Sequence, residues 1–102
     1  MEDRIQSSGI REIVLQQIRE LAEQYDLDKV LLFGSRARGD YKRTSDIDLA
    51  VCGGNVTEFT LAVDEETDTL LEFDVVDLDK RIQAELRSNI DRDGVVLYEK
   101  VR

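Results

Sequence analysis

GSRARG at residues 34–39 and SDIDLAV at residues 45–51 are the two stretches that decide the fold of this chain. The first follows an apolar run at residues 29–33, and its leading glycine allows the backbone to turn sharply. The second places two carboxylates at the head of another apolar run. This pattern predicts two strands joined through a short turn or helix, with a polar site where they meet.

Hydrophobic spacing elsewhere predicts alternating helices and strands. Apolar residues recur at helical spacing over residues 9–25, with Ser8 as the expected N-cap. The other elements are expected as strands over residues 29–33, 46–52, 70–78 and 95–98, a short helix within 57–69, and a helix capped by Asp79 and closed by Gly94. This order predicts an α/β (α+β) fold in which helices pack on a small mixed central sheet.

Composition narrows the class of protein. The chain has 102 residues, of which 41% are hydrophobic and 36% charged, as expected for one globular domain. It has no histidine, which excludes a histidine general base, and its single cysteine excludes an intrachain disulfide. The net charge of −9 argues against direct binding to nucleic acid. No apolar run reaches the ~18 residues of a membrane span, and the acidic start lacks a secretion signal, so a cytoplasmic protein without membrane attachment is expected.

The glycine turn has the chemistry of an anion site. Backbone N–H groups after Gly34 lack partners at a helix start, and the Ser35 hydroxyl adds a further donor. Arg36 and Arg38 bring positive charge, and a guanidinium group suits phosphate oxygens, although Arg38 could equally form a surface ion pair. A plain strand-to-helix connection capped by Ser35 remains an alternative. A P-loop is excluded because the Gly-Lys-Ser/Thr ending is missing.

The paired carboxylates have the chemistry of a metal site. Asp46 and Asp48 project from one face of the expected strand, where two like charges are costly without a cation between them. Carboxylate oxygens are ligands that Mg²⁺ prefers, with water and substrate phosphates completing its shell. Asp74 or Asp77 could supply a third carboxylate, and the more central Asp74 is favoured. An exposed acidic strand face is the alternative.

Together these motifs resemble the minimal nucleotidyltransferases of the DNA polymerase beta superfamily. That family combines a Gly-Ser turn, a following Asp-x-Asp and a third carboxylate on a neighbouring strand. Here the pattern falls on Gly34-Ser35, Asp46-Ile47-Asp48 and Asp74, and the resemblance runs from about Val30 to Tyr98. It implies a nucleotidyltransferase fold.

The resemblance also implies roles for the motif residues. Gly34 and Ser35 would hold the triphosphate of ATP, and Arg36 would be a further phosphate contact. A hydroxyl acceptor would attack the α-phosphorus, and pyrophosphate would leave. Catalysis and the binding of two Mg²⁺ ions would fall to three aspartates, Asp46, Asp48 and Asp74.

The resemblance extends to domain organisation and partners. We expect one domain over residues 1–102, with an N-terminal helix at 1–27 and a catalytic core at 28–102. Because little room remains for an acceptor-binding domain, a second polypeptide is expected to supply the acceptor. Small members of the family resemble antitoxins that transfer AMP to a tyrosine of a HEPN toxin, which would give a hetero-oligomer. The alternatives are a partner-binding module without catalysis, or transfer to a small molecule such as an aminoglycoside with a second subunit.

Overall fold

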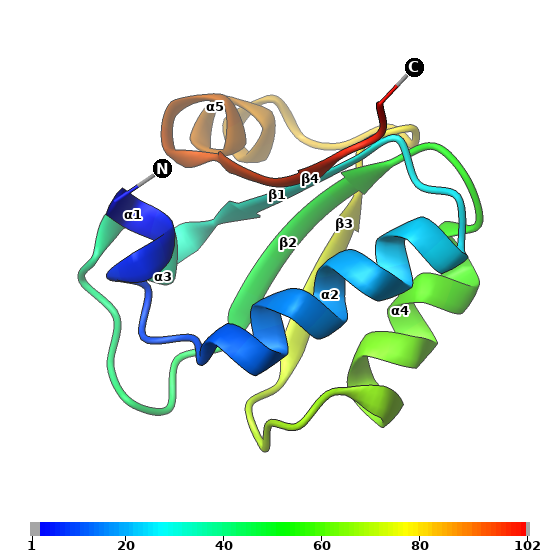
Figure 1. Cartoon of the computed structure of the whole chain (residues 1–102). Helices are drawn as coiled ribbons and strands as arrows, with labels where there is room; N and C mark the ends of the chain where they lie inside the picture. The colour runs from blue at the N-terminus through cyan, green and yellow to red at the C-terminus, as the bar shows by residue number, and fades with distance from the viewer. Residues whose placement is uncertain (1–2, 102) are drawn as a thin grey trace.

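The structure, a computed structural model, describes residues 3–101 and is built on a four-stranded mixed sheet (Figure 1). The strand order is β3-β2-β1-β4, with β1 antiparallel to β2 and β4, and with β2 parallel to β3. The elements are α1 (Asp3–Gln6), α2 (Glu12–Gln24), β1 (Lys29–Phe33), α3 (Gly34–Arg38), β2 (Ile47–Cys52), α4 (Val56–Glu66), β3 (Phe73–Asp77), α5 (Ala84–Asp93) and β4 (Val95–Glu99). The predicted α+β fold class is confirmed.

Helices cover both faces of the sheet, because strands such as β2 carry buried apolar residues on each face. Its alternating residues Ile47, Leu49 and Val51 are fully buried in the core under α2 and α4. Ala50 faces the opposite way and packs with Phe33 and with Ile90 of α5 in a smaller apolar cluster. In Figure 1 α5 accordingly lies across the sheet from α2 and α4. Within residues 3–101, no helix has the length and apolar character that crossing a bilayer requires.

The long N-terminal helix starts later than its periodicity predicts. It begins at Glu12, and Arg11 rather than Ser8 holds the N-cap position. Gly9 causes the break because its φ of 75° is left-handed, and a Cβ there would lie 2.6 Å from the Tyr41 ring. Ser8 is fully buried, and its hydroxyl donates to the carbonyl of Ile5 in α1 at 2.6 Å. The Ser8 N-cap prediction is therefore wrong.

Strand β3 and helix α5 are both shorter than predicted. The strand covers Phe73–Asp77 rather than residues 70–78, and the N-cap position of α5 belongs to Gln83 rather than Asp79. The Asp79 carboxylate instead accepts the backbone N–H of Gly53 at 2.7 Å and so ties the end of β3 to the end of β2. Asp79 therefore makes a tertiary contact with Gly53 and does not cap α5.

The buried ring of Phe59 on α4 should dominate the stability of the core under α2 and α4, because this side chain is 0% exposed. We expect Phe59→Ala to lower the free energy of unfolding by about 3–5 kcal/mol through lost burial and a residual cavity. The matched control, Leu61→Ala on the same helix, removes a side chain that is 53% exposed and should cost less than about 1 kcal/mol. Urea unfolding measures both, and similar losses would contradict this packing.

Candidate active site

Gly34 connects β1 to α3 and lies directly against Asp48. Its φ is +74°, in the left-handed region, and a Cβ at this position would lie 2.1 Å from Asp48 Oδ2. A larger residue here would be strained by the dihedral angle and would displace the Asp48 carboxylate. Ser35 follows as a half-buried residue of α3. The turn therefore brings the Gly34–Ser35 backbone beside a carboxylate of β2.

Strand pairing brings a second carboxylate to the same place. Asp48 pairs with Phe33 on β1 and, across the parallel β2–β3 ladder, with Asp74 on β3. Asp46 lies in the loop, one residue before β2 begins. Neighbouring parallel strands are about 4.8 Å apart, and residues in register point to the same face, so Asp48 and Asp74 share one side of the sheet.

Electrostatics shows that the three aspartates interact. The pKa of Asp48 is raised to about 6, first by burial and then by the negative charges of Asp74 and Asp46. The positive charges of Arg38 and Arg36 oppose this rise without cancelling it. The sequence motifs thus meet at one sheet edge, as an anionic site next to the glycine turn.

Asp77, the other candidate for the third carboxylate, lies away from this edge. It pairs with Val51, three residues further along β2 than Asp48. Its Oδ1 accepts the backbone N–H of Asp79 at 2.9 Å, which stabilises the turn after β3. Asp74 is exposed and in register with Asp48, so the geometry groups Asp74 with the motif aspartates.

Arg36 is buried and its guanidinium serves the protein's own backbone. It is 2% exposed and donates to the carbonyls of Ser45 at 3.0 Å, Ser8 at 2.9 Å and Arg43 at 3.2 Å. It also lies 4.7 Å from the centroid of the Tyr41 ring, in cation–π geometry. Its assignment as a phosphate contact stays a prediction, while its observed contacts hold the loop that leads to Asp46. Sequence spacing gave no signal for these partners, which lie up to 28 residues away.

Arg38 forms the surface ion pair that the sequence left open. Its guanidinium contacts Asp40 at 3.2 Å and Asp93 at 3.3 Å. Asp93, at the end of α5, also pairs with Arg92 at 3.0 Å, and Arg92 and then Arg38 hold the pKa of its carboxyl below the ordinary value. This network attaches α3 to α5. No local sequence signal marks Asp93 for this role, because burial of an acid at a helix end depends on a distant partner.

Comparison with known proteins identifies the family. A profile described as "Polymerase beta, Nucleotidyltransferase" matches residues 16–102. A Methanocaldococcus jannaschii protein named "putative protein adenylyltransferase" is 36% identical over 81 residues, covering 71% of this chain and 79% of the relative. A second protein of that name from the same organism is 48% identical over 44 residues, covering 43% of this chain and 51% of the relative.

Solved structures agree with this result. A chain of a structure described as a toxin-antitoxin with AMP-PNP matches with a TM-score of 0.62 and 28% identity, covering 84% of this chain and 73% of that one. A chain of a mutant toxin-antitoxin MntA-HpeT matches with a TM-score of 0.64 and 26% identity, covering 83% and 72%. The fold and its matches define the protein as a nucleotidyltransferase. It belongs to the polymerase beta nucleotidyltransferase family.

Asp46, Asp48 and Asp74, near the starts of β2 and β3, offer oxygen ligands that fit the divalent cation implied by this family. Asp48 is partly desolvated and faces the charges of Asp46 and Asp74, so a cation would relieve their repulsion. Within residues 3–101, no three acidic or cysteine side chains are gathered into a ready-made metal site. Mg²⁺ does not require such a cage, since it is commonly held by one or two carboxylates together with water and substrate phosphates.

The contacts of Arg36 predict a large loss of stability when its guanidinium is removed. We expect Arg36→Gln to lower the free energy of unfolding by about 3 kcal/mol, because three carbonyls lose a charged donor and the Tyr41 ring loses its cation. The control Arg81→Gln changes an exposed arginine that makes no hydrogen bond or ion pair in the described part of the chain, and should cost below about 0.5 kcal/mol. If denaturant unfolding shows the same loss of unfolding free energy for both variants, Arg36 does not stabilise the fold through these contacts.

The raised pKa of Asp48 predicts a pH-dependent stability. Its contribution is fully present below the ordinary pKa of 3.8 and is lost as the pH rises through about 6, since the folded protein binds the proton more tightly. In metal-free buffer Asp48→Asn should therefore be more stable than the parent at about pH 7.5 and lose this advantage by about pH 4. Urea unfolding across this range measures the difference. Asp91→Asn, an exposed change on α5, is the control, and a pH-independent difference for Asp48→Asn would refute the prediction.

Proposed function

We propose that this nucleotidyltransferase transfers AMP from ATP to a tyrosine hydroxyl of a partner toxin of the HEPN class, and thereby acts as an antitoxin. The relatives named as adenylyltransferases and the structural likeness to toxin-antitoxin chains support this choice. The observation that carries it is the register of Asp48 with Asp74, beside the Gly34 backbone. That arrangement places a glycine turn beside a partly buried carboxylate and its acidic neighbours.

In this proposal the Gly34–Ser35 backbone and the Ser35 hydroxyl bind the triphosphate. Asp46, Asp48 and Asp74 would hold Mg²⁺, which would neutralise phosphate charge and polarise the α-phosphorus. Asp48 is held in position because β1 and β3 pair with it on both sides. Its pKa is raised by burial and by neighbouring carboxylates, and a bound cation would favour its charged form.

The acceptor side of the reaction uses the exposed aspartate of β3. The acceptor oxygen forms a bond to the α-phosphorus, the bond from that phosphorus to the bridging oxygen breaks, and pyrophosphate leaves. Asp74 takes the hydroxyl proton. Because Asp74 and Asp46 are exposed, a hydroxyl carried by another protein can approach them from solvent. An acceptor on a partner chain therefore suits this geometry.

Labelled ATP tests the proposal directly. The protein is incubated with Mg²⁺, ATP labelled at the α-phosphate and the protein encoded by the neighbouring gene. We expect label on one tyrosine of that protein, located by mass spectrometry, and a loss of about a hundredfold or more in rate for Asp48→Asn. Asp91→Asn on α5 is the matched control and should keep the parent rate.

Two outcomes would contradict this function. If the partner toxin is silenced without acquiring label, and Asp48→Asn silences it as well as the parent does, the protein acts by binding alone. If label appears on an aminoglycoside and not on the partner, the acceptor class is wrong while nucleotidyl transfer stands.

A further inference from the structure

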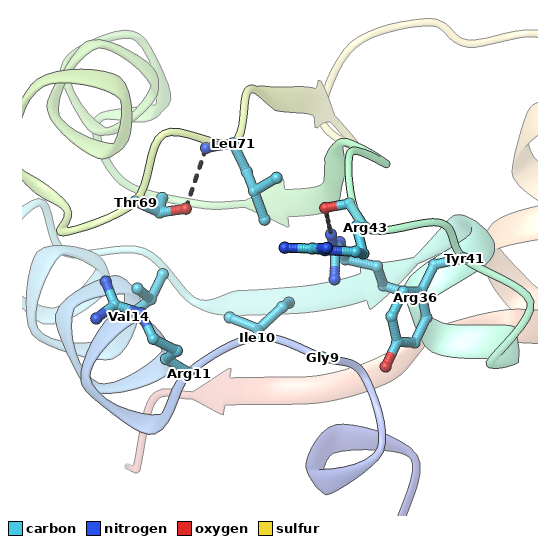
Figure 2. Close-up of a pocket in the computed structure, with 9 residues that line it drawn as sticks. All are labelled: Gly9, Ile10, Arg11, Val14, Arg36, Tyr41, Arg43, Thr69 and Leu71. Carbon is cyan, nitrogen blue, oxygen red and sulfur yellow. Dashed lines mark hydrogen bonds between the residues drawn. The ribbon is translucent and has the colours of Figure 1, made fainter.

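A pocket of about 560 Å³ lies apart from the aspartates, where three distant segments meet. Its wall is formed by Arg36 together with residues from these segments, namely Gly9, Ile10, Arg11, Val14, Tyr41, Arg43, Thr69 and Leu71 (Figure 2). Its apolar lining residues Ile10, Val14 and Leu71 belong to the core under α2 and α4. Asp48 points to the other face of β2, the one it shares with Ala50. The pocket is therefore distinct from the candidate active site.

The charge of this pocket is opposite to that of the chain. Its nine lining residues include three arginines, Arg11, Arg36 and Arg43, and no acid, although the net charge of the chain is −9. In the view of Figure 2 the side chains of Arg36 and Arg43 both extend toward Ile10 and Leu71, and the Arg36 guanidinium donates to the Arg43 carbonyl at 3.2 Å. Two cations held together repel each other unless an anion lies between or beside them.

Donors remain for such an anion. Arg36 uses three of the five N–H donors of a guanidinium on backbone carbonyls. Arg43 is exposed, and its side chain makes no hydrogen bond or ion pair within residues 3–101. Arg43 is held in place through its own backbone, because its carbonyl accepts from Arg36 at 3.2 Å. The loop thus presents a guanidinium without an internal partner to a pre-formed pocket.

Size and polarity define the ligand. Small-molecule pockets are about 300–1,000 Å³, so this one exceeds the needs of a lone inorganic anion. Two guanidinium groups lining one pocket match the double charge of a phosphate monoester better than the single charge of a carboxylate. We propose that the pocket binds a phosphate-bearing organic molecule, with its phosphate at Arg36 and Arg43 and its apolar or ring portion against Ile10, Val14 and Leu71. This binding needs no divalent cation.

AMP, inorganic phosphate and adenosine are the probes for this site. Each is titrated into the isotopically labelled full chain without divalent cation, and backbone amide shifts are followed by NMR. We expect AMP to shift the amides of residues 9–11, 41–43 and 69–71 saturably, phosphate to shift them only weakly, and adenosine to leave them unchanged. Saturable shifts confined to residues 34–35 and 46–48, or none at all, would overturn the proposal. Equal affinities for AMP and phosphate would refute the role of the apolar wall.

Substitutions of two neighbouring basic residues distinguish specific binding in the pocket from non-specific attraction to positive charge. Arg43→Gln should weaken AMP binding about tenfold or more, whereas Lys42→Gln, on the same exposed loop but outside the pocket lining, should leave it unchanged. Equal weakening by both would show attraction to the loop's charge and overturn the site. Unfolding midpoints confirm that both variants fold. The readout uses neither metal nor acceptor, so its failure is distinguishable from failure of AMP transfer.

Discussion

The contact between the Gly34 backbone and the Asp48 carboxylate is the constraint on which the rest of the structure depends. It requires that β1 end against the beginning of β2, which the antiparallel register provides. Parallel pairing of β2 with β3 then carries Asp74 to the same edge. A slip of one residue in the β1–β2 ladder would turn Asp48 away from the Gly34 turn, and a slip in the β2–β3 ladder would turn Asp74 to the face opposite Asp48. The site is therefore a product of backbone register more than of side-chain adjustment.

The two arginines near the site, Arg36 and Arg38, stabilise the segments around it but leave the negative charge of its aspartates largely uncompensated. Arg36 is occupied by backbone carbonyls and Tyr41, and Arg38 by Asp40 and Asp93. Consequently Asp48 keeps a raised pKa despite two arginines nearby. A nucleotidyltransferase that relies on divalent cations benefits from this arrangement, because a carboxylate already neutralised by an internal ion pair binds a metal less well.

The acidic chain separates its charges by face. Carboxylates gather at the β2–β3 edge, on the side of the sheet covered by α5, while the arginine-lined pocket opens beside α2. Arg36 contributes to both regions. It lies in α3 just after the glycine turn, lines the pocket, and donates to the carbonyl of Ser45 in the loop that leads to Asp46. The loop between α3 and β2 therefore contributes both to the proposed nucleotide site and to the pocket proposed to bind an organic phosphate.

The sequence by itself determined the order of the main elements and the alternation of β2, because these depend on spacing between near neighbours along the chain. Only the tertiary structure decided that Asp74 rather than Asp77 faces Asp48, that Arg36 is buried among carbonyls, and that Asp79 bonds to β2 instead of capping α5. Each of these outcomes depends on which distant segment packs against the residue, and the local periodicity of the sequence does not contain that information.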